Sequence, residues 1–314
     1  MPAPGNSQRR PFFVVLNRRS GSGDGGATEE AIRGALDATG HPYRLFCAKH
    51  PRHLGELAGQ AVEAARAQGG AVVVAGGDGT INAVVQAVLP SGLPLGVLPQ
   101  GTFNFFGRCH GLPEGDAGEG IRGLLDAQER PVQVGLVNDR VFLVNASLGL
   151  YPELLERREQ DKRRFGRHRL VALLSGLRAL LGSYPDLRLS LCEDGQWQVR
   201  RSTTLVVGNN RLQLESIGIP EADAVTRGAL VGIVLPPLAR WHMILTAIRG
   251  LSGHLGDVEK VDNFAFTELE VALPRRRELK LAIDGEIVRL PLPLRFRVAP
   301  QALRLLVPRN RSDR

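Results

Sequence analysis

In the first 130 residues, short apolar runs alternate with segments in which apolar positions recur at helical spacing. The runs at 12–17, 43–47, 71–75 and 95–98 predict buried strands. Helical spacing appears over 27–39 and 54–68, and again over 81–88. Strands that alternate with helices form a parallel sheet, and such sheets bind ligands at the carboxyl ends of their strands. We therefore expect residues 1–130 to form an α/β domain.

After about residue 130 the pattern changes to short, strand-like apolar runs separated by turn residues such as Asp284-Gly285. This pattern predicts a second, β-rich domain over 131–300, built as a sandwich or a barrel. A helical insertion is expected over 157–181, and 301–314 form a basic C-terminal segment that can return to the first domain. The predicted strands are 132–137, 141–146, 187–191, 198–207, 230–235, 268–273, 279–283 and 294–298.

A glycine-rich turn follows the predicted strand at 71–75 and precedes a predicted helix. It contains Gly76, Gly77, Asp78, Gly79 and Thr80. Such a turn lets backbone N–H groups approach a phosphate, and the helix that follows points its positive dipole end at the same place. A carboxylate inside an anion site is best explained by Mg²⁺ or by a ligand hydroxyl. The alternative is an ordinary tight turn between strand and helix.

Two further loops leave the ends of predicted strands. After the strand at 95–98, the segment 99–108 offers Gly101 and Thr102 as donors, Asn104 as donor and acceptor, and Arg108 as a partner for phosphate. Alone, it could equally be a loop with a helix cap. The loop after the first strand is flexible and basic, as suits a triphosphate, or else it is a mobile surface loop. Its candidate residues are Asn17, Arg18, Arg19, Ser20 and Gly21.

The composition narrows the class of partner. The chain carries 40 basic and 32 acidic residues, a formal charge of +8, which suits an anionic partner. Only 5% of residues are aromatic, without the basic–aromatic interleaving that stacks bases, so nucleic acid is not expected. Three distant cysteines form neither a metal-ligand spacing nor a disulfide framework. We expect neither a signal peptide nor a membrane-spanning segment.

In combination, these motifs resemble the catalytic-domain family of the diacylglycerol kinases, particularly the soluble bacterial lipid kinases. The family's Gly-Gly-Asp-Gly-Thr sequence is matched by 76–80, followed by its usual Asn at Asn82. Its Asn-Pro-x-Ser-Gly loop is matched by 17–21 with Arg18 in place of Pro. Its Pro-x-Gly-Thr-x-Asn segment is matched by 99–104, and its late Asp-Gly-Glu by 284–286.

The resemblance implies an ATP-binding α/β domain followed by a β-sandwich-like lipid-binding domain, with the active site between them. It also implies ATP- and Mg²⁺-dependent transfer of the γ-phosphoryl group to the hydroxyl of a diacylglycerol or related lipid. Glu286 would be the general base, Asp284 its supporting acid or a metal partner, and Asp78 the residue that positions Mg²⁺. The nucleotide would be held by the first loop, by 76–82 and by Thr102.

The sequence also departs from the family. Phe105 stands where many members carry Asp, and Arg227-Gly228 replaces an Asp-Gly linked to a second Mg²⁺ site. Residues 211–215 replace a usual glycine cluster. Two alternatives therefore stay open. One is a NAD kinase-like enzyme, which would share the glycine turn, although the chain lacks an Asn-Glu pair suited to the ribose. The other is a catalytically silent relative that binds lipid or nucleotide.

A basic cluster at 157–169 precedes leucines that repeat at helical spacing up to residue 181. This arrangement could bring a soluble enzyme to an anionic membrane, or it could be a solvated charge run before a core helix. We expect a cytoplasmic protein that associates peripherally with the inner face of the membrane. The expected partners are ATP and a lipid at that surface, and a homodimer stays open.

Overall fold

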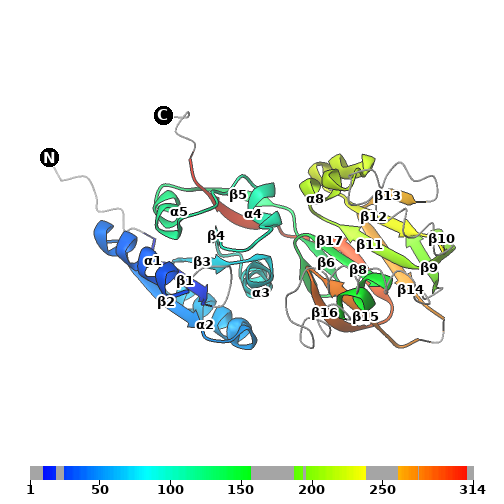
Figure 1. Ribbon diagram of the computed structural model, residues 1–314, viewed down its shortest axis with the longest axis horizontal. Coiled ribbons are helices and arrows are strands. Elements are labelled where there is room, and N and C mark those ends of the chain that lie inside the picture. Colours follow the sequence, from blue (N-terminus) through cyan, green and yellow to red (C-terminus); the bar gives the residue numbers. More distant parts are fainter. Residues whose placement is uncertain are drawn as a thin grey trace, which may run out of the picture. The chain divides into compact units, whose positions relative to one another are not determined.

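The computed structural model describes residues 10–18, 25–156, 187–193, 196–237, 261–274 and 276–309 (Figure 1). The chain divides into two compact units. Unit 1 comprises Met1–Val132 and Pro300–Arg314, and unit 2 comprises Gln133–Ala299. Unit 1 is an α/β domain with a mainly parallel sheet, and unit 2 is an antiparallel all-β domain. The predicted fold class is confirmed.

Sheet A of unit 1 has the order β2-β1-β3-β4-β18-β5. The four strands from β2 to β4 run parallel, and every residue of β1 and β3 is buried, as expected for strands covered on both faces. The strands of sheet A are β1 (Phe12–Asn17), β2 (Tyr43–Ala48), β3 (Ala71–Gly76), β4 (Leu95–Pro99), β5 (Gln128–Val132) and β18 (Leu303–Val307).

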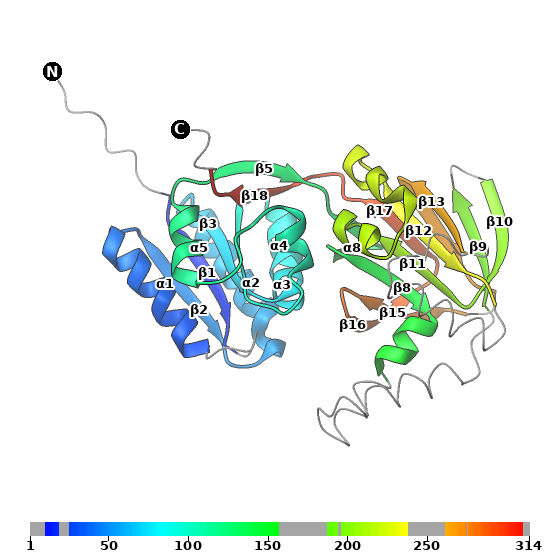
Figure 2. The same cartoon turned by 45° about the horizontal axis from the view of Figure 1, so that its top comes forward.

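Helices cover both faces of sheet A (Figure 2). Helices α1 (Gly25–Thr39) and α5 (Ala117–Leu124) pack together, and their buried side chains form one core with β1 and β3. Helices α2 (Leu54–Ala67) and α3 (Asp78–Val88) also pack against each other and against these strands. The short helix α4 (Phe105–Cys109) and the 3-10 turns η1 (Pro51–His53) and η2 (Leu89–Ser91) complete unit 1.

The C-terminal segment is more than a basic tail. Strand β18 pairs in parallel with β4 and antiparallel with β5, so residues from the end of the chain lie inside the first sheet. Leu305 in this strand is fully buried. Arg304 is exposed and forms an ion pair with Glu129. The part of the basic C-terminal segment that forms β18 is therefore a strand of the sheet of unit 1.

Unit 2 is a sandwich of two six-stranded sheets whose inner faces share one apolar core. Sheet B has the order β10-β9-β14-β17-β6-β7, and sheet C has the order β13-β12-β11-β8-β15-β16. Sheet B consists of β6 (Gly135–Val137), β7 (Arg140–Phe142), β9 (Leu187–Glu193), β10 (Gln196–Ser202), β14 (Glu268–Ala272) and β17 (Leu294–Val298).

Sheet C consists of β8 (Asn145–Gly149), β11 (Thr204–Gly208), β12 (Leu230–Leu235), β13 (Asp262–Phe266), β15 (Glu278–Ile283) and β16 (Glu286–Pro291). Helix α8 (Arg211–Ser216) and the 3-10 helix η3 (Pro220–Arg227) pack together beside β12.

Three predicted strands are each split in two, at points where the chain changes sheet. The predicted strand 132–137 divides where β5 of sheet A ends and β6 of sheet B begins. The strand 141–146 divides between β7 and β8, and 198–207 divides between β10 and β11. At the last break, the Ser202 hydroxyl donates to the Thr204 carbonyl at 2.7 Å. The residues of such a run do not reveal the crossing, because the sheet that each half joins is decided by its partner strands.

One prediction concerns residues that the structure does not describe. The helical insertion predicted at 157–181, with its basic cluster and leucines, lies outside the described residues. Within the described part of the chain, no helix is long and apolar enough to cross a bilayer. Cys47, Cys109 and Cys192 are half-buried free thiols.

Candidate functional site

Three predicted loops follow β1, β3 and β4, which are neighbouring parallel strands of sheet A. Parallel strands end at the same edge of a sheet, so these loops begin side by side. Of the first loop, only Asn17 and Arg18 belong to the described residues, and Arg19, Ser20 and Gly21 lie outside them. The turn 76–80 and the loop 100–104 are described in full.

Asn17 and Thr80 join the end of β1 to the glycine turn. The Asn17 side-chain amide donates to the Thr80 hydroxyl at 3.0 Å, and both residues are buried. Gly76 leaves room for this threonine, because a Cβ on Gly76 would lie 2.5 Å from the Thr80 Cβ. The first two predicted loops are therefore locked together by a side-chain hydrogen bond.

Two glycines let the turn and the next loop touch. A Cβ on Gly101 would lie 2.8 Å from the Gly77 Cα, so a side chain there would push the two backbones apart. Asn104 shapes the second loop with a left-handed backbone at φ 48°, and its side-chain oxygen accepts the Gly101 N–H at 2.8 Å. Asn104 is buried, so its acceptor serves the loop itself.

Asp78 connects the same two loops through its carboxylate. One oxygen accepts the Phe105 N–H and the other the Phe106 N–H, each at 3.2 Å. These are N–H groups at the start of α4, which have no partner within the helix. Asp78 thus caps the helix that follows the second loop. Each oxygen keeps a further lone pair that a cation or a ligand donor could use.

Arg18 is engaged by a carboxylate of α1. Its guanidinium binds Glu29 through Nε at 2.9 Å and through a terminal nitrogen as well. Burial alone would raise the pKa of Glu29, but hydrogen bonds led by that from Arg18 outweigh it and lower the pKa. A phosphate at this loop would have to share Arg18 with Glu29.

The outer part of the second loop is exposed. Thr102, Phe103 and Arg108 all face solvent, with Phe103 65% exposed. The rings of Phe103 and Phe105 stack with their centroids 5.7 Å apart. Arg108 is therefore accessible to an anion, whereas Asn82, in the helix after the glycine turn, accepts a hydrogen bond from Gln86 at 3.1 Å.

One basic segment at this edge was not predicted. Strand β2 neighbours β1, and it is followed by Lys49, His50 and Arg52, which are all exposed. The parallel-strand rule places this segment at the same edge as the phosphate loops. The order of strands and loops in the sequence could have indicated this segment. It was missed because it lacks the glycines that are typical of a phosphate-binding loop.

In unit 2, Asp284 holds the turn between β15 and β16. Its carboxylate accepts three backbone N–H groups, from Leu143 at 2.7 Å and from Val144 and Asn145 at 2.9 Å each. Asp284 has a positive φ of 45°, as does a residue in a tight hairpin turn. The turn is thereby fixed to the segment that links β7 to β8.

Glu286 begins β16, two residues after Asp284, and its side chain is exposed. Within the described part of the chain, its carboxylate has neither a hydrogen-bond partner nor an ion-pair partner. The two acids of this turn thus differ. Asp284 accepts three backbone hydrogen bonds, whereas the exposed Glu286 carboxylate can accept a proton from a ligand.

A buried amide network supports the other side of the same segment. The Asn209 side chain donates to the Leu143 carbonyl at 3.3 Å and accepts from Gln133 at 2.8 Å. Asn145 donates to Gln213 at 2.8 Å. Sequence analysis did not predict this network. In the sequence, only the adjacent pair Asn209 and Asn210 points to it, because the hydrogen-bond partners of Asn209 are far away along the chain.

The comparisons with known proteins bear on both units. The family model of the diacylglycerol kinase catalytic domain matches residues 11–137, a range that includes the three loops of unit 1. The segment 11–137 is thus similar to the diacylglycerol kinase catalytic domain. This finding confirms the resemblance that the sequence motifs suggested.

Relatives with this domain include named lipid kinases. A "probable lipid kinase YegS-like" protein of Pseudomonas aeruginosa is 29% identical over 90% of this chain and 91% of its own length. A diacylglycerol kinase of Bacillus subtilis is 37% identical, but the match covers only 32% of this chain and 34% of that protein. The similarity to the Pseudomonas protein thus extends over most of the chain.

Solved structures share the fold. The crystal structure of a diacylglycerol kinase from Bacillus anthracis covers 98% of this chain and 99% of its own, with a TM-score of 0.66 and 16% identity. Another structure from the same organism gives a TM-score of 0.71 at 18% identity and covers 98% of this chain. At such identities the likeness concerns the fold alone.

The residues of the kinase domain can be tested against the Mg²⁺ that its family implies. Among the described residues, no group of three or more His, Cys, Asp or Glu side chains could hold a metal. Mg²⁺ in kinases is commonly bound by one or two carboxylates, with phosphates and water completing its shell. The free lone pairs of Asp78 fit that kind of site, and a site made only of protein ligands does not fit.

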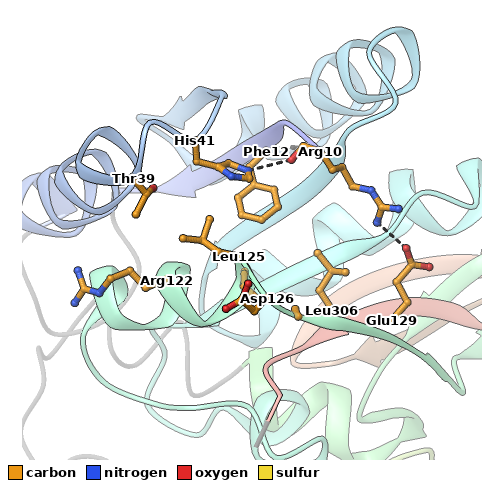
Figure 3. Close-up of a pocket in the computed structure, with 11 residues that line it drawn as sticks. Arg10, Phe12, Thr39, His41, Arg122, Leu125, Asp126, Glu129 and Leu306 are labelled. Carbon is orange, nitrogen blue, oxygen red and sulfur yellow. Dashed lines mark hydrogen bonds and ion pairs between the residues drawn. The ribbon is translucent and has the colours of Figure 1, made fainter. Parts of the chain in front are cut away.

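A cavity of about 850 Å³ lies elsewhere in unit 1 (Figure 3). It opens near the start of β1 and the ends of α1 and α5, and is lined by Phe12, His41 and Leu125 among others. An ion pair between Arg10 and Glu129 crosses one side of it, at 2.6 Å. None of the predicted site residues lines this cavity. We therefore do not assign it as the nucleotide site, although it is large.

Asp78→Ala removes the shared acceptor of two N–H groups, each worth about 1 kcal/mol or more. We expect amide hydrogen exchange at Phe105 and Phe106 to accelerate about tenfold or more. The matched control is Asp116→Ala, since Asp116 accepts the Glu119 N–H at 2.8 Å at the start of α5. The control should accelerate exchange at Glu119 only. Unchanged exchange at Phe105 in the Asp78 variant would contradict the capping role.

His110 makes the region after α4 sensitive to acid. Its ring lies 4.6 Å from that of Phe106, and burial, with the positive charge of Arg130, lowers the His110 pKa from 6.5 to about 4. Between pH 6.5 and about 4, this histidine binds protons more readily in the unfolded chain than in the folded protein. The free energy of unfolding therefore decreases as the pH falls through this range. Unfolding in urea should show a loss of about 2 kcal/mol between pH 7 and 5. His110→Gln should largely remove this dependence, and an equal loss in that variant would contradict it.

Proposed function

We propose that this protein transfers the γ-phosphoryl group of ATP to the hydroxyl of a lipid, diacylglycerol or a related one, in a Mg²⁺-dependent reaction. The observation that carries the proposal is the fixed convergence of the phosphate loops in a kinase-family domain. Asn17 binds Thr80, Gly77 abuts Gly101, and Asp78 ties the glycine turn to α4. Phosphoryl transfer depends mainly on such positioning and on charge stabilisation.

On the nucleotide side, the backbone of 76–80 would bind phosphate oxygens through its N–H groups. Thr102 would add a hydroxyl donor, and Arg108 a guanidinium that can bind phosphate with two hydrogen bonds. Asn17, Asn82, Asn104 and Gly101 would act mainly by shaping these loops. Lys49 and Arg52 would raise the positive potential at the same sheet edge.

Asp78 would hold Mg²⁺ through the lone pairs that α4 leaves free. When bound, Mg²⁺ neutralises the charge that develops on the phosphate oxygens. The backbone N–H groups of α4 keep the Asp78 carboxylate in one orientation. Asp78 therefore has two proposed tasks, and the helix cap is a precondition for the cation site.

On the acceptor side, Glu286 would be the general base. The lipid hydroxyl oxygen forms the new bond to the γ-phosphorus, its proton passes to the Glu286 carboxylate, and ADP leaves with the electrons of the broken P–O bond. Asp284 would be a positioning residue, because its carboxylate is occupied by three backbone donors. Its three hydrogen bonds fix the turn that presents Glu286.

The expected place of this reaction is the cytoplasmic side of a membrane. ATP is cytoplasmic and the acceptor lipid resides in a bilayer, so a kinase acting on both would associate peripherally. The formal charge of +8 suits an anionic lipid surface.

The direct test uses γ-labelled ATP and Mg²⁺ with a panel of diacylglycerol, monoacylglycerol, phosphatidylglycerol and sphingoid bases, and with NAD as a parallel acceptor. We expect label in an organic-phase product, which also identifies the lipid class. Label in NADP would contradict the proposal in favour of the related NAD kinase activity. Nucleotide binding without label in any product would contradict it in favour of a silent relative.

Glu286→Gln should lower kcat about a hundredfold or more with little change in ATP affinity, because the amide cannot accept the hydroxyl proton. Initial rates measure kcat, and equilibrium binding of a fluorescent ATP analogue measures affinity. The matched control is Glu278→Gln, an exposed acid on the neighbouring strand β15, which should keep its activity. A variant that loses only ATP affinity would contradict the general-base role.

A further inference from the structure

Helix α1 carries a buried acid, Glu29, that the proposed phosphoryl transfer does not use. Glu29 is 9% exposed and lies near the start of the helix. Its carboxylate accepts hydrogen bonds from Arg18, directly after β1, from Arg33, one turn further along α1, and from Cys47 of β2 at 3.3 Å. A buried carboxylate is costly unless charged or polar groups bind it, and here two guanidinium groups do so. Glu29 therefore joins the end of β1, α1 and β2 at one point.

The two oxygens of the Glu29 carboxylate bind different arginines. Oε2 accepts from Nε of Arg18 at 2.9 Å and from Nη2 of the same side chain. Oε1 accepts from Nη2 of Arg33 at 3.1 Å. Arg18 is thus bound along one edge of its planar guanidinium, the edge formed by Nε and Nη2. The outer edge, formed by Nη1 and Nη2, carries further N–H donors in the fork geometry that matches a phosphate.

The Arg18 side chain is accessible although the acid that holds it is buried. It is 43% exposed, against 11% for the side chain of Glu29. An arginine at the surface ordinarily samples many rotamers, and binding that orders it loses free energy to this entropy. Two hydrogen bonds to one buried oxygen restrict the Arg18 side chain before any ligand arrives. Arg18 is therefore pre-organised for a partner at its outer edge.

The backbone of Arg18 is fixed at the same point. Its N–H donates to the Ala48 carbonyl at the end of β2, at 3.3 Å. A Cβ on Gly25 would overlap the Arg18 carbonyl oxygen, so α1 begins directly against this residue. The preceding residue, Asn17, donates to Thr80 of the glycine turn at 3.0 Å. Arg18 thus lies next to the hydrogen bond that joins the end of β1 to the proposed phosphate site.

The charges of the cluster formed by Arg18, Glu29 and Arg33 favour an anionic ligand. Two guanidinium groups share one carboxylate, which leaves an excess of one positive charge. Burial opposes ionisation of Glu29, but hydrogen bonds led by that from Arg18 lower its pKa, so the acid stays charged at neutral pH. The outer edge of a guanidinium binds a phosphate with two parallel hydrogen bonds. The ligand class that fits is therefore a phosphate group.

We propose that Glu29 is a positioning residue, which holds Arg18 so that the outer edge of its guanidinium binds a phosphate group of the nucleotide. Glu29 itself does not touch the ligand. The identity of the ligand rests on the proposed function, because the nucleotide is the phosphate donor of that reaction. The proposal fixes the sign of one effect. By charge alone, loss of an acid near a phosphate would tighten binding, whereas loss of a positioning acid weakens it.

The test measures binding of ATP, with Mg²⁺, to the full chain by isothermal titration calorimetry, and it needs no lipid acceptor. Arg18→Gln should weaken binding about tenfold and reduce its dependence on salt, because a charge-assisted contact is lost. Glu29→Ala should weaken binding about threefold or more, because Arg18 is no longer pre-organised. Glu29→Gln, which keeps the size of the side chain, should change affinity in the same direction, since a neutral amide holds a guanidinium less firmly.

A double variant separates positioning from a general effect on the fold. In the Arg18→Gln background, Glu29→Ala should have no further effect on ATP affinity, because the positioned contact is already lost. The matched control is Glu129→Ala. Glu129 also accepts from two arginines, Arg10 at 2.6 Å and Arg304 at 2.8 Å, but it lines the cavity that contains none of the predicted site residues. This variant should bind ATP as the parent does.

A second arm distinguishes a nucleotide from a lipid headgroup as the source of the phosphate. Co-sedimentation with vesicles of phosphatidylcholine and phosphatidylglycerol should be the same for Arg18→Gln and for the parent. Weaker vesicle binding by this variant, with unchanged ATP affinity, would overturn the choice of ligand.

Three further results would overturn the proposal. The first is an Arg18→Gln variant that binds ATP as the parent does. The second is unchanged or tighter ATP binding in both Glu29 variants, which would mean that Glu29 acts by its charge alone. The third is an effect of Glu29→Ala that persists in the Arg18→Gln background, which would make the role of Glu29 purely structural.

Failure of the proposed function is a separate result. A parent protein that binds ATP but transfers no label to a lipid would contradict the kinase reaction and leave these binding results in force. A parent protein that does not bind ATP would overturn both the reaction and the role of Glu29.

Discussion

Two carboxylates satisfy backbone N–H groups that secondary structure leaves without partners, and the candidate site depends on them. Buried or part-buried N–H groups need an acceptor, and each one left without it costs free energy comparable to a lost hydrogen bond. Asp78 supplies acceptors to the start of α4, and Asp284 supplies them to the segment between β7 and β8. Each carboxylate joins backbone segments that are distant along the chain. The loops of each unit are thereby fixed without the help of a ligand.

This constraint changes how the acids of the motifs are interpreted. Asp78, Asp284 and Glu286 all fall in motifs shared with a kinase family, and the motifs alone do not distinguish their roles. The hydrogen bonds separate them. Asp284 accepts three backbone hydrogen bonds and Asp78 accepts two, whereas Glu286 is exposed beside the turn that Asp284 fixes. A proton acceptor needs free lone pairs, so the structure favours Glu286 for that task over either aspartate.

The sequence predicted what depends on local pattern. Buried strands, helical spacing and glycine turns each involve consecutive residues, so the α/β unit and its glycine-rich loops were predictable, as was a β-rich second unit. What depends on partners far away was not. The three split strands look continuous because the sheet that each half joins depends on its partner strands. The pairing of β18 could not be located because its partners, β4 and β5, lie more than 150 residues earlier. The hydrogen bonds of Asn209 could not be predicted either, because their partners are also far away along the chain.

The net charge of the chain also takes on a more specific meaning in the structure. A formal net charge of +8 suggests an anionic partner but does not show where on the protein it would bind. Several arginines are neutralised within the fold, such as Arg18 by Glu29, Arg200 by Asp262 and Arg304 by Glu129. Exposed cations stand instead at the carboxyl edge of sheet A, where Lys49, Arg52 and Arg108 lie. Partners of opposite charge are attracted to where the field is left unbalanced, so this edge of the sheet suits an anionic ligand.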